Sequence, residues 1–192
     1  MNIQDKHIVL IGFKHVGKSV IGKILAKKIN RAFIDIDKEI EKKFKNKQQK
    51  KISCRQIMHE YGESFFRDIE EKTLCSVIQS RPIVMALGGG TPLKKENQLL
   101  IQSHVVIHIN ASKEIVFKRI MAKGLPAFFN SNQEPFEFFN DLWKKREPIY
   151  QKLATFSINN NQSLKKVVAQ IIQKLKTFDK PSSGEKNELF NH

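Results

Sequence analysis

The chain has 192 residues, a length that suits one domain or at most two small ones with a substantial hydrophobic core. Hydrophobic residues make up 40% of it and charged residues 28%, which excludes a fully disordered or collagen-like chain. Its two cysteines, Cys54 and Cys75, form no CxxC pair or Cys/His cluster, so we expect neither a disulfide framework nor a structural zinc site. The apolar run Ile8–Ile11 is too short for a membrane span or a signal peptide, and we predict a cytoplasmic protein without a membrane partner.

The chain is strongly basic. Lys and Arg total 34 against 19 Asp and Glu, which gives a formal net charge of +15. Such a charge attracts nucleic acids, anionic metabolites and nucleotide phosphates without choosing among them. The densest basic run, Lys42–Lys51, contains one aromatic residue and therefore offers no stacking platform for bases. We interpret this run as a solvated, lysine-rich helix end or loop, and we expect no nucleic-acid partner.

Short apolar runs alternate with helical patterns along the chain. The five predicted strands are His7–Ile11, Ala32–Ile36, Pro82–Leu87, His104–Ile109 and Thr155–Ile158. Between them, Gly17–Asn30 and Glu63–Gln79 place apolar residues at helical spacing and are predicted as amphipathic helices. This alternation predicts a three-layer α/β/α fold, in which helices cover both faces of a five-stranded parallel sheet.

The C-terminal part combines one more helix with two irregular segments. Ser163 is a suitable N-cap for a last helix whose apolar residues recur with helical period up to Leu175. We therefore predict a folded domain over residues 1–176 and a disordered tail over 177–192. Residues 121–140 mix Gly, Pro and Asn with five phenylalanines and fit neither period. This segment is either a lid or an irregular connection between helices.

A glycine-rich motif directly follows the first predicted strand. Residues 12–19 (GFKHVGKS) match G-x-x-x-x-G-K-[ST] in full and open the first helix. Such a loop wraps a phosphate with its backbone N–H groups, and the helix N-terminus adds partial positive charge. Lys18 can then contact the β- and γ-phosphates, and the Ser19 hydroxyl can coordinate Mg²⁺. The motif predicts that ATP and Mg²⁺ are bound by Gly12, Lys14, His15, Val16, Gly17, Lys18, Ser19 and Val20.

Other polar residues and glycines lie where predicted elements end. Asp35 and Asp37 end the second strand, and their i, i+2 spacing places both carboxylates on one face of the extended chain, as a site or as surface acids. The glycines 88–90 end the third strand, either as a tight turn or where a small ligand approaches the backbone. Arg146 precedes Pro148 at a predicted helix end, a position that also suits ordinary capping by a cation.

In combination, these motifs resemble those of the shikimate kinases over residues 8–175. The family pattern consists of a P-loop, D-x-D, G-E-x-x-F-R-x-x-E, G-G-G and R-x-P-L-Y, in this order. The corresponding residues here are 12–19, Asp35 and Asp37, Gly62–Glu70, Gly88–Gly90 and Arg146–Tyr150. The resemblance implies a P-loop kinase of the nucleoside monophosphate kinase-like group. Its reaction would be the ATP-dependent phosphorylation of the 3-hydroxyl of shikimate, in the chorismate route to aromatic amino acids.

The resemblance also implies roles on the nucleotide side. Lys18 and Asp37 would be catalytic, and Asp37 would contact the substrate hydroxyls and orient or deprotonate the attacking one. Ser19 would bind Mg²⁺ with support from Asp35. Arg119 would lie against the adenine.

On the acceptor side, the resemblance assigns the shikimate carboxylate to Arg67 and Arg146, a task that suits planar guanidinium groups. Gly88, Gly89 and Gly90 would line the binding site of the ring. The expected partners are shikimate and ATP, and the expected assembly is a monomer.

Two positions depart from the family pattern. His15 stands where the family usually has a further glycine, so its backbone must adopt the angles that this position demands. Leu125 stands before Pro126, where the family lid usually presents an arginine toward the phosphates. We hypothesise that Lys123 replaces this cation on lid closure, with Arg119 as the other local candidate.

Two alternative functions stay open. One is a small-molecule kinase of the same fold with another acceptor, such as a gluconate-like acid, which would need a different acceptor pocket. The other is a catalytically weak nucleotide-binding protein whose basic surface binds an acidic partner. The missing lid arginine is the main support for this second alternative.

Overall fold

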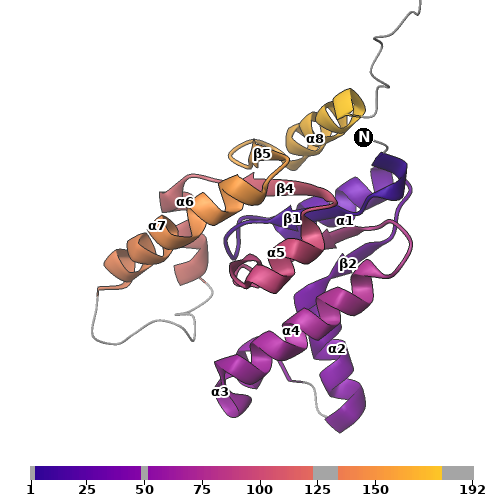
Figure 1. The fold of residues 1–192 in the computed structure, drawn as a ribbon. Coiled ribbons are helices and arrows are strands. Elements are labelled where there is room, and N and C mark those ends of the chain that lie inside the picture. The colour runs from indigo at the N-terminus through magenta and orange to yellow at the C-terminus, as the bar shows by residue number, and fades with distance from the viewer. Residues whose placement is uncertain (1–2, 49–51, 123–133, 179–192) are drawn as a thin grey trace, which may run out of the picture.

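The computed structural model describes residues 3–48, 52–122 and 134–178, which form one sheet with flanking helices (Figure 1). The strands are β1 (Ile8–Ile11), β2 (Phe33–Asp35), β3 (Val84–Ala86), β4 (Val105–Asn110) and β5 (Phe156–Asn159). All pairings are parallel, and the order is β2-β3-β1-β4-β5. The predicted α/β fold with a five-stranded parallel sheet is confirmed.

The centre of the sheet explains the uninterrupted apolar runs in the sequence. In β1, Ile8 aligns with Val84 of β3 on one side and with Val105 of β4 on the other. Every residue of β1 and β3 is buried, as expected for central parallel strands covered on both faces. Because β1 and β3 are neighbours and parallel, the loops that follow them meet at one edge of the sheet, where ligands of such sheets bind.

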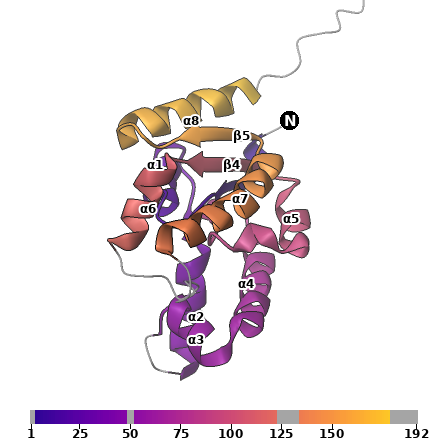
Figure 2. The same cartoon turned by 90° about the vertical axis from the view of Figure 1, so that its left-hand side faces the viewer.

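Helices connect the strands and form both the flanking layers and a projecting arm. They are α1 (Lys18–Lys28), α2 (Ile36–Gln48), α3 (Cys54–Tyr61), α4 (Glu63–Ile78), α5 (Lys95–Ile101), α6 (Lys113–Met121), α7 (Pro135–Leu153) and α8 (Leu164–Phe178), with short 3₁₀ turns η1 (Ile3–Asp5) and η2 (Thr91–Leu93). Figure 2 shows α8 beside β5 at one end of the molecule and α2, α3 and α4 extending from the other. No described helix is both long and apolar enough to cross a bilayer.

The segment after β2 differs from its prediction. The strand ends at Asp35, and Ile36 begins α2, so Asp37 lies in the first turn of a helix and not on an extended chain. The cause is a helical repeat of apolar residues, since Ile36, Ile40 and Phe44 are spaced by four and are all buried. The basic run is therefore helical up to Gln48, and residues 49–51 lie outside the described residues.

The predicted lid segment is also partly helical. α7 begins at Pro135, a residue that suits the first turn of a helix, so residues 135–140 are not an irregular connection. The residues on which the lid hypothesis depends, Lys123, Leu125 and Pro126, lie outside the described residues.

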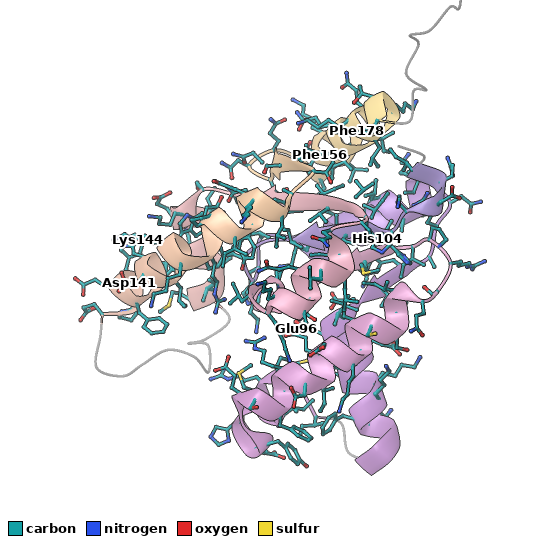
Figure 3. The ribbon with its side chains drawn as sticks, viewed as in Figure 1. Glu96, His104, Asp141, Lys144, Phe156 and Phe178 are labelled. Carbon is teal, nitrogen blue, oxygen red and sulfur yellow. The ribbon has the colours of Figure 1, made fainter. Side chains whose placement is uncertain are left out.

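Both C-terminal helices end later than predicted. α7 continues to Leu153 with Pro148 inside it, so Arg146 lies within the helix and does not cap its end. α8 continues to Phe178, whose ring stacks on Phe156 of β5 at a centroid distance of 5.7 Å (Figure 3). The folded unit therefore extends two residues beyond its predicted end at residue 176, and the rest of the tail lies outside the described residues.

Candidate active site

The P-loop joins β1 to α1 through backbone conformations that few residues adopt. Gly12 has a φ of 135°, and a Cβ built on it would lie 2.3 Å from the carbonyl oxygen of Ile109, so only glycine fits. His15 has a φ of 65°, in the left-handed region, which costs an L-residue about 1–2 kcal/mol. His15 thus adopts the backbone angles of a glycine position, as the sequence predicted, and the packed loop holds it in this strained conformation.

Lys18 begins α1 with its ammonium group against the P-loop. Its Nζ donates hydrogen bonds to the carbonyl oxygens of Gly12 and Phe13, both at 2.8 Å, and its side chain is buried. Burial lowers the pKa of Lys18 to about 8, although the carboxylates of Asp37 and Asp35 oppose this effect. The ammonium group therefore stays largely charged at neutral pH, at the place where the loop can hold phosphates.

Ser19 and Asp35 bring two oxygen ligands together beside the P-loop. The hydroxyl of Ser19 donates a hydrogen bond to Oδ2 of Asp35, and both residues are half-buried. Mg²⁺ in such sites takes one or two protein oxygens and completes its shell with phosphates and water, so this pair suits the ion. Within the described ranges, no group of three or more His, Cys, Asp or Glu side chains could hold a metal ion without such additional ligands.

Asp37 lies in a crowded, largely acidic environment at the start of α2. A Cβ built on Gly88 would lie 2.7 Å from Oδ1 of Asp37, so the bare backbone there gives the carboxylate its space. Burial raises the pKa of Asp37 to about 6, with further contributions from the neighbouring Asp35 and Glu70. A carboxylate with this pKa is ionised at neutral pH and accepts a proton more readily than an ordinary aspartate, as a general base requires.

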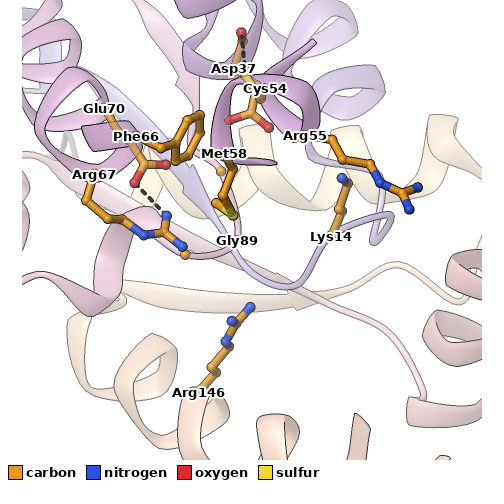
Figure 4. A pocket seen from close by; sticks show the side chains of 12 residues that line it. Lys14, Asp37, Cys54, Arg55, Met58, Phe66, Arg67, Glu70, Gly89 and Arg146 are labelled. Carbon is orange, nitrogen blue, oxygen red and sulfur yellow. Dashed lines mark hydrogen bonds and ion pairs between the residues drawn. The ribbon is translucent and has the colours of Figure 1, made fainter. Parts of the chain in front are cut away.

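Two adjoining pockets lie at this edge of the sheet. The first, which we call the P-loop pocket, is lined by Lys14, His15, Gly17, Lys18, Ser19, Val20, Asp35, Asp37, Lys38, Glu41, Ser53, Cys54, Arg55, Leu87, Gly88 and Gly89. We call the second one the acceptor pocket (Figure 4). Its lining residues come from several segments of the chain: Lys14, Asp37, Cys54, Arg55, Met58, Phe66, Arg67, Glu70, Gly88, Gly89, Gly90 and Arg146. Six of them also line the P-loop pocket: Lys14, Asp37, Cys54, Arg55, Gly88 and Gly89. The two pockets therefore share a wall that includes Asp37, so a hydroxyl group in one can approach a phosphate in the other.

Arg67 is fixed in the wall of the acceptor pocket by two carboxylates. Its guanidinium donates to Oε2 of Glu70 at 2.8 Å and to Oε1 of Glu63 at 3.1 and 3.3 Å. Glu70 is buried and also accepts a hydrogen bond from Thr91 at 2.5 Å. A Cβ built on Gly90 would lie 2.6 Å from both terminal nitrogens of Arg67. The glycine thus keeps space beside a guanidinium that can still donate to a ligand carboxylate.

Arg146 enters the same pocket from α7 (Figure 4). Its guanidinium carbon lies 5.9 Å from the ring centroid of Phe13 in the P-loop. One helical turn later, the hydroxyl of Tyr150 donates to the carbonyl oxygen of Gly89 at 2.5 Å, which attaches α7 to the triple glycine. The residues predicted for the acceptor side, Asp37, Arg67, Gly88, Gly89, Gly90 and Arg146, all line this one pocket.

The predicted nucleotide-binding residues divide into two groups. Those that line the P-loop pocket are Lys14, His15, Gly17, Lys18, Ser19 and Val20. Gly12 and Val16 support the loop from within, since Gly12 packs against β4 and the carbonyl of Val16 accepts a hydrogen bond from Asn160 at 2.7 Å. Arg119 is exposed on α6, with Nη1 3.5 Å from the carbonyl oxygen of His15 at the rim of the loop.

Five lining residues of the acceptor pocket were not predicted as site residues. Phe66 and Glu70 belong to the motif Gly62–Glu70, whereas Cys54, Arg55 and Met58, all on α3, lie outside every motif found in the sequence. A local signal for this helix exists, because Ser53 and Gln56 have the spacing of a capping box and form one in the structure. That signal predicts a short helix, but it does not predict that the helix lines the same pockets as the P-loop.

A strand–loop–helix phosphate site beside a buried carboxylate and two arginines defines a P-loop kinase of a small acidic acceptor. Comparison with known proteins agrees with this class and identifies the family. The sequence profile of the family "Shikimate kinase" matches residues 14–176. The chain belongs to the shikimate kinase family.

Individual relatives cover nearly the whole chain. A shikimate kinase of Thermodesulfovibrio yellowstonii is 35% identical over 182 residues, which are 94% of this chain and 99% of the relative. Among solved structures, a shikimate kinase from Acinetobacter baumannii in complex with shikimate has a TM-score of 0.81 and 27% identity, covering 92% of this chain and 96% of that one. A gluconokinase from Sinorhizobium meliloti shares the fold alone, with a TM-score of 0.54 and 13% identity over 94% of this chain and all of its own.

Proposed function

We propose that this enzyme transfers the γ-phosphoryl group of ATP to the 3-hydroxyl of shikimate, giving shikimate 3-phosphate and ADP in the chorismate route to aromatic amino acids. The observation that carries this proposal is the shared wall of the two pockets, in which Asp37 lies between the P-loop and two arginines. Membership of the shikimate kinase family supports the identity of both substrates.

The acceptor pocket offers a distinct group for each part of shikimate. Arg67 and Arg146 hold the carboxylate, because a guanidinium group donates two parallel hydrogen bonds to a carboxylate. Asp37 accepts hydrogen bonds from the ring hydroxyls. Gly88, Gly89 and Gly90 allow the ring to approach the backbone. A Cβ on Gly88 would collide with Asp37, one on Gly90 would collide with Arg67, and one on Gly89 would crowd the backbone of the P-loop.

In the transfer step, the 3-hydroxyl oxygen forms a bond to the γ-phosphorus while the bond from that phosphorus to the β–γ bridging oxygen breaks. The hydroxyl proton passes to Asp37, whose pKa of about 6 matches this task near neutral pH. The ammonium group of Lys18 offsets the negative charge that moves onto the leaving ADP.

The nucleotide side of the site relies mainly on the backbone. The N–H groups of residues 12–19 surround the phosphates, and Arg119 at the rim of the loop contacts the adenine. Ser19 and Asp35 would hold Mg²⁺, Asp35 through water. When bound, the ion supplies further neutralisation of phosphate charge.

A different acceptor acid is the second candidate function. It is favoured by the composition of the acceptor pocket, because two guanidinium groups suit any small carboxylate, including a gluconate-like acid. A catalytically weak nucleotide-binding protein with an acidic partner is supported by the net charge of +15 and by Leu125 at the lid position. The placement of Asp37 between the two pockets favours catalysis over this alternative.

One assay separates these functions. The protein is mixed with ATP and Mg²⁺. Shikimate, gluconate and nucleoside monophosphates are then added in separate reactions, and ADP release is followed with coupling enzymes. We expect ADP release in the reaction that contains shikimate and none with gluconate or nucleoside monophosphates. Faster ADP release with gluconate would identify the second acceptor. Tight nucleic-acid binding at about 0.2 M salt without turnover would instead support a binding protein.

The remaining expectations are proposals of the same kind. We infer a monomeric enzyme of the cytoplasm with no nucleic-acid partner. Size-exclusion chromatography with light scattering tests the monomer, and fractionation of cells tests the location.

A further inference from the structure

Arg55 is the arginine that lines both pockets. The two arginines assigned to the acceptor, Arg67 and Arg146, line the acceptor pocket alone, whereas Arg55 lines the P-loop pocket as well. Its side chain is exposed and forms no hydrogen bond or ion pair with any other described residue. Arg67, by contrast, is paired with Glu63 and Glu70. Arg55 therefore places an uncompensated positive charge on the path between the two substrates.

The backbone around Arg55 is fixed close to the catalytic carboxylate. α3 begins with a capping box at Ser53, and the N–H of Cys54 donates to Oε1 of Glu41 on α2 at 3.2 Å. The thiol of Cys54 lies 3.2 Å from the carbonyl oxygen of Asp37. The residue directly before Arg55 is thus hydrogen-bonded to the residue that carries the base, and Figure 4 shows the guanidinium group of Arg55 near the ammonium group of Lys14.

The charges around this place point to an anion between them. Lys14 lines both pockets too and forms no hydrogen bond or ion pair within the described part of the chain. The carboxylate of Asp37, which lines both pockets, offsets part of the charge of Lys14. Two cations in one space still repel each other, and a bound anion relieves this repulsion. Other carboxylates of the P-loop pocket are already engaged, since Glu41 pairs with Lys38 at 2.6 Å and Asp35 accepts from Ser19. The anion that passes through this space during the reaction is the transferred phosphoryl group.

We propose that Arg55, with Lys14 beside it, donates hydrogen bonds to the oxygens of the transferring phosphoryl group and stabilises the charge of the transition state. The inference rests on the proposed kinase function and adds a catalytic residue to it. Arg55 loses no proton in this role, because a guanidinium group stays charged throughout. The cation that acts on the phosphoryl group is thus contributed by α3 and not by Lys123.

The test compares three single variants with the unmodified enzyme. Arg55→Ala removes the cation, Arg55→Lys keeps the charge without the guanidinium fork, and Arg81→Ala is the matched control, because Arg81 is also exposed and lines neither pocket. We expect Arg55→Ala to lower kcat about 30- to 100-fold, with KM for shikimate and for ATP within threefold. Arg55→Lys should recover a large part of this loss, and Arg81→Ala should change nothing.

A binding measurement separates catalysis from ground-state binding. ADP with aluminium fluoride and shikimate mimics the transferring phosphoryl group, and its affinity should fall in Arg55→Ala by about the same factor as kcat. A kcat within twofold of the unmodified enzyme would overturn the inference, as would a loss confined to KM for shikimate. If Lys123→Ala lowers kcat and Arg55→Ala does not, the cation belongs to Lys123.

This test is distinct from that of the proposed function. If the unmodified enzyme phosphorylates an acid other than shikimate, the proposed acceptor is wrong, and the same three variants are assayed with that acid. The role of Arg55 is then judged by the ratio of kcat between Arg55→Ala and the unmodified enzyme with that acid. Equal melting temperatures of the variants, measured by circular dichroism, confirm that each one is folded.

Discussion

The two pockets that meet at Asp37 are built in different ways. The phosphate end of the P-loop pocket is formed by residues of one continuous run, 14–20, whose backbone follows conformations set by Gly12 and Gly17, while its other lining residues come from the segments around Asp35, Ser53 and Gly88. The acceptor pocket is formed by side chains from segments as distant in the chain as Lys14 and Arg146. A site made of backbone depends on the conformation of the loop, whereas a site made of side chains depends on each contributing residue.

This difference predicts how substitutions act in the two halves. In the P-loop, apart from Lys18 and Ser19, whose side chains act in the reaction, a substitution that preserves the backbone should change stability more than catalysis, as the presence of His15 at a left-handed position indicates. In the acceptor pocket, one lost side chain should change the binding of one substrate and leave the other unaffected. The variants below test this distinction, beginning with the shared wall.

Asp37→Asn should have the largest effect, because both halves use this carboxylate. We expect kcat to fall about 10³-fold through loss of the general base. The same change should raise the free energy of unfolding at pH 7.5 by about 1–3 kcal/mol. The reason is that the folded pKa is raised to about 6, so Asp37 destabilises the fold as pH rises through that value. Steady-state kinetics and urea unfolding measure both effects, with the exposed Asp68→Asn as control. A variant that is slower but less stable would contradict the assigned burial of the charge.

Arg146→Ala should affect the acceptor half alone. Loss of a charge-assisted contact to the carboxylate predicts an increase of about 30-fold in KM for shikimate, with KM for ATP within twofold. Initial rates at varied concentrations of each substrate measure this separation. The neighbouring Lys145→Ala is the control, since Lys145 is exposed and lines neither pocket. Equal increases for both substrates would show that the two halves are not independent.

The pH dependence of kcat/KM tests the shared wall without a substitution. Asp37 must be ionised to accept a proton, so kcat/KM should fall as pH decreases through about 6 and be about tenfold lower at pH 5 than at pH 7. Rates measured in buffers of constant ionic strength give the midpoint. A profile that stays flat down to pH 5 would mean that Asp37 is not the base or that its pKa is not raised.

His15→Gly should have the smallest effect and should act on stability. Relief of the left-handed strain exceeds the entropy that glycine adds to the unfolded chain, so the free energy of unfolding should rise by about 0.5–1 kcal/mol. We expect kcat to stay within threefold. Asn30 has a φ of 53° outside the site, and because asparagine tolerates this region, Asn30→Gly should give a smaller gain. Thermal unfolding of both variants decides the point, and a His15→Gly variant with strongly reduced kcat would assign the imidazole a role in the reaction.

The two halves also differ in how far the sequence predicts them. The five strands and the P-loop were predicted because each is a local pattern, an apolar run or a spacing of glycine, lysine and serine. Asp37 was predicted in the site but on the wrong element. Its i, i+2 spacing from Asp35 is compatible with a strand end, while the four-residue spacing of Ile36, Ile40 and Phe44 that makes α2 a helix was overlooked.

The acceptor pocket was predicted only through resemblance to a family. Nothing near Arg55 in the sequence indicates that it lines the same pockets as Lys14, since the position of α3 across these pockets from the P-loop is a property of the folded chain. Pro148 led to a wrong prediction of a helix end at Arg146, because proline ordinarily ends a helix and here lies inside one. Tertiary contacts, among them the hydrogen bond from Tyr150 to Gly89, hold α7 together beyond it.

Pro148 leaves one gap in the hydrogen-bond ladder of α7. Proline has no N–H group, so it donates no hydrogen bond to the carbonyl of Lys144. The helix is nonetheless anchored on both sides of this gap, since Trp143 stacks on Phe13 before it and Tyr150 donates to the carbonyl of Gly89 after it. Arg146 therefore projects from a stretch of helix that is fixed at both ends. Such preorganisation reduces the conformational entropy that binding of an acceptor carboxylate costs.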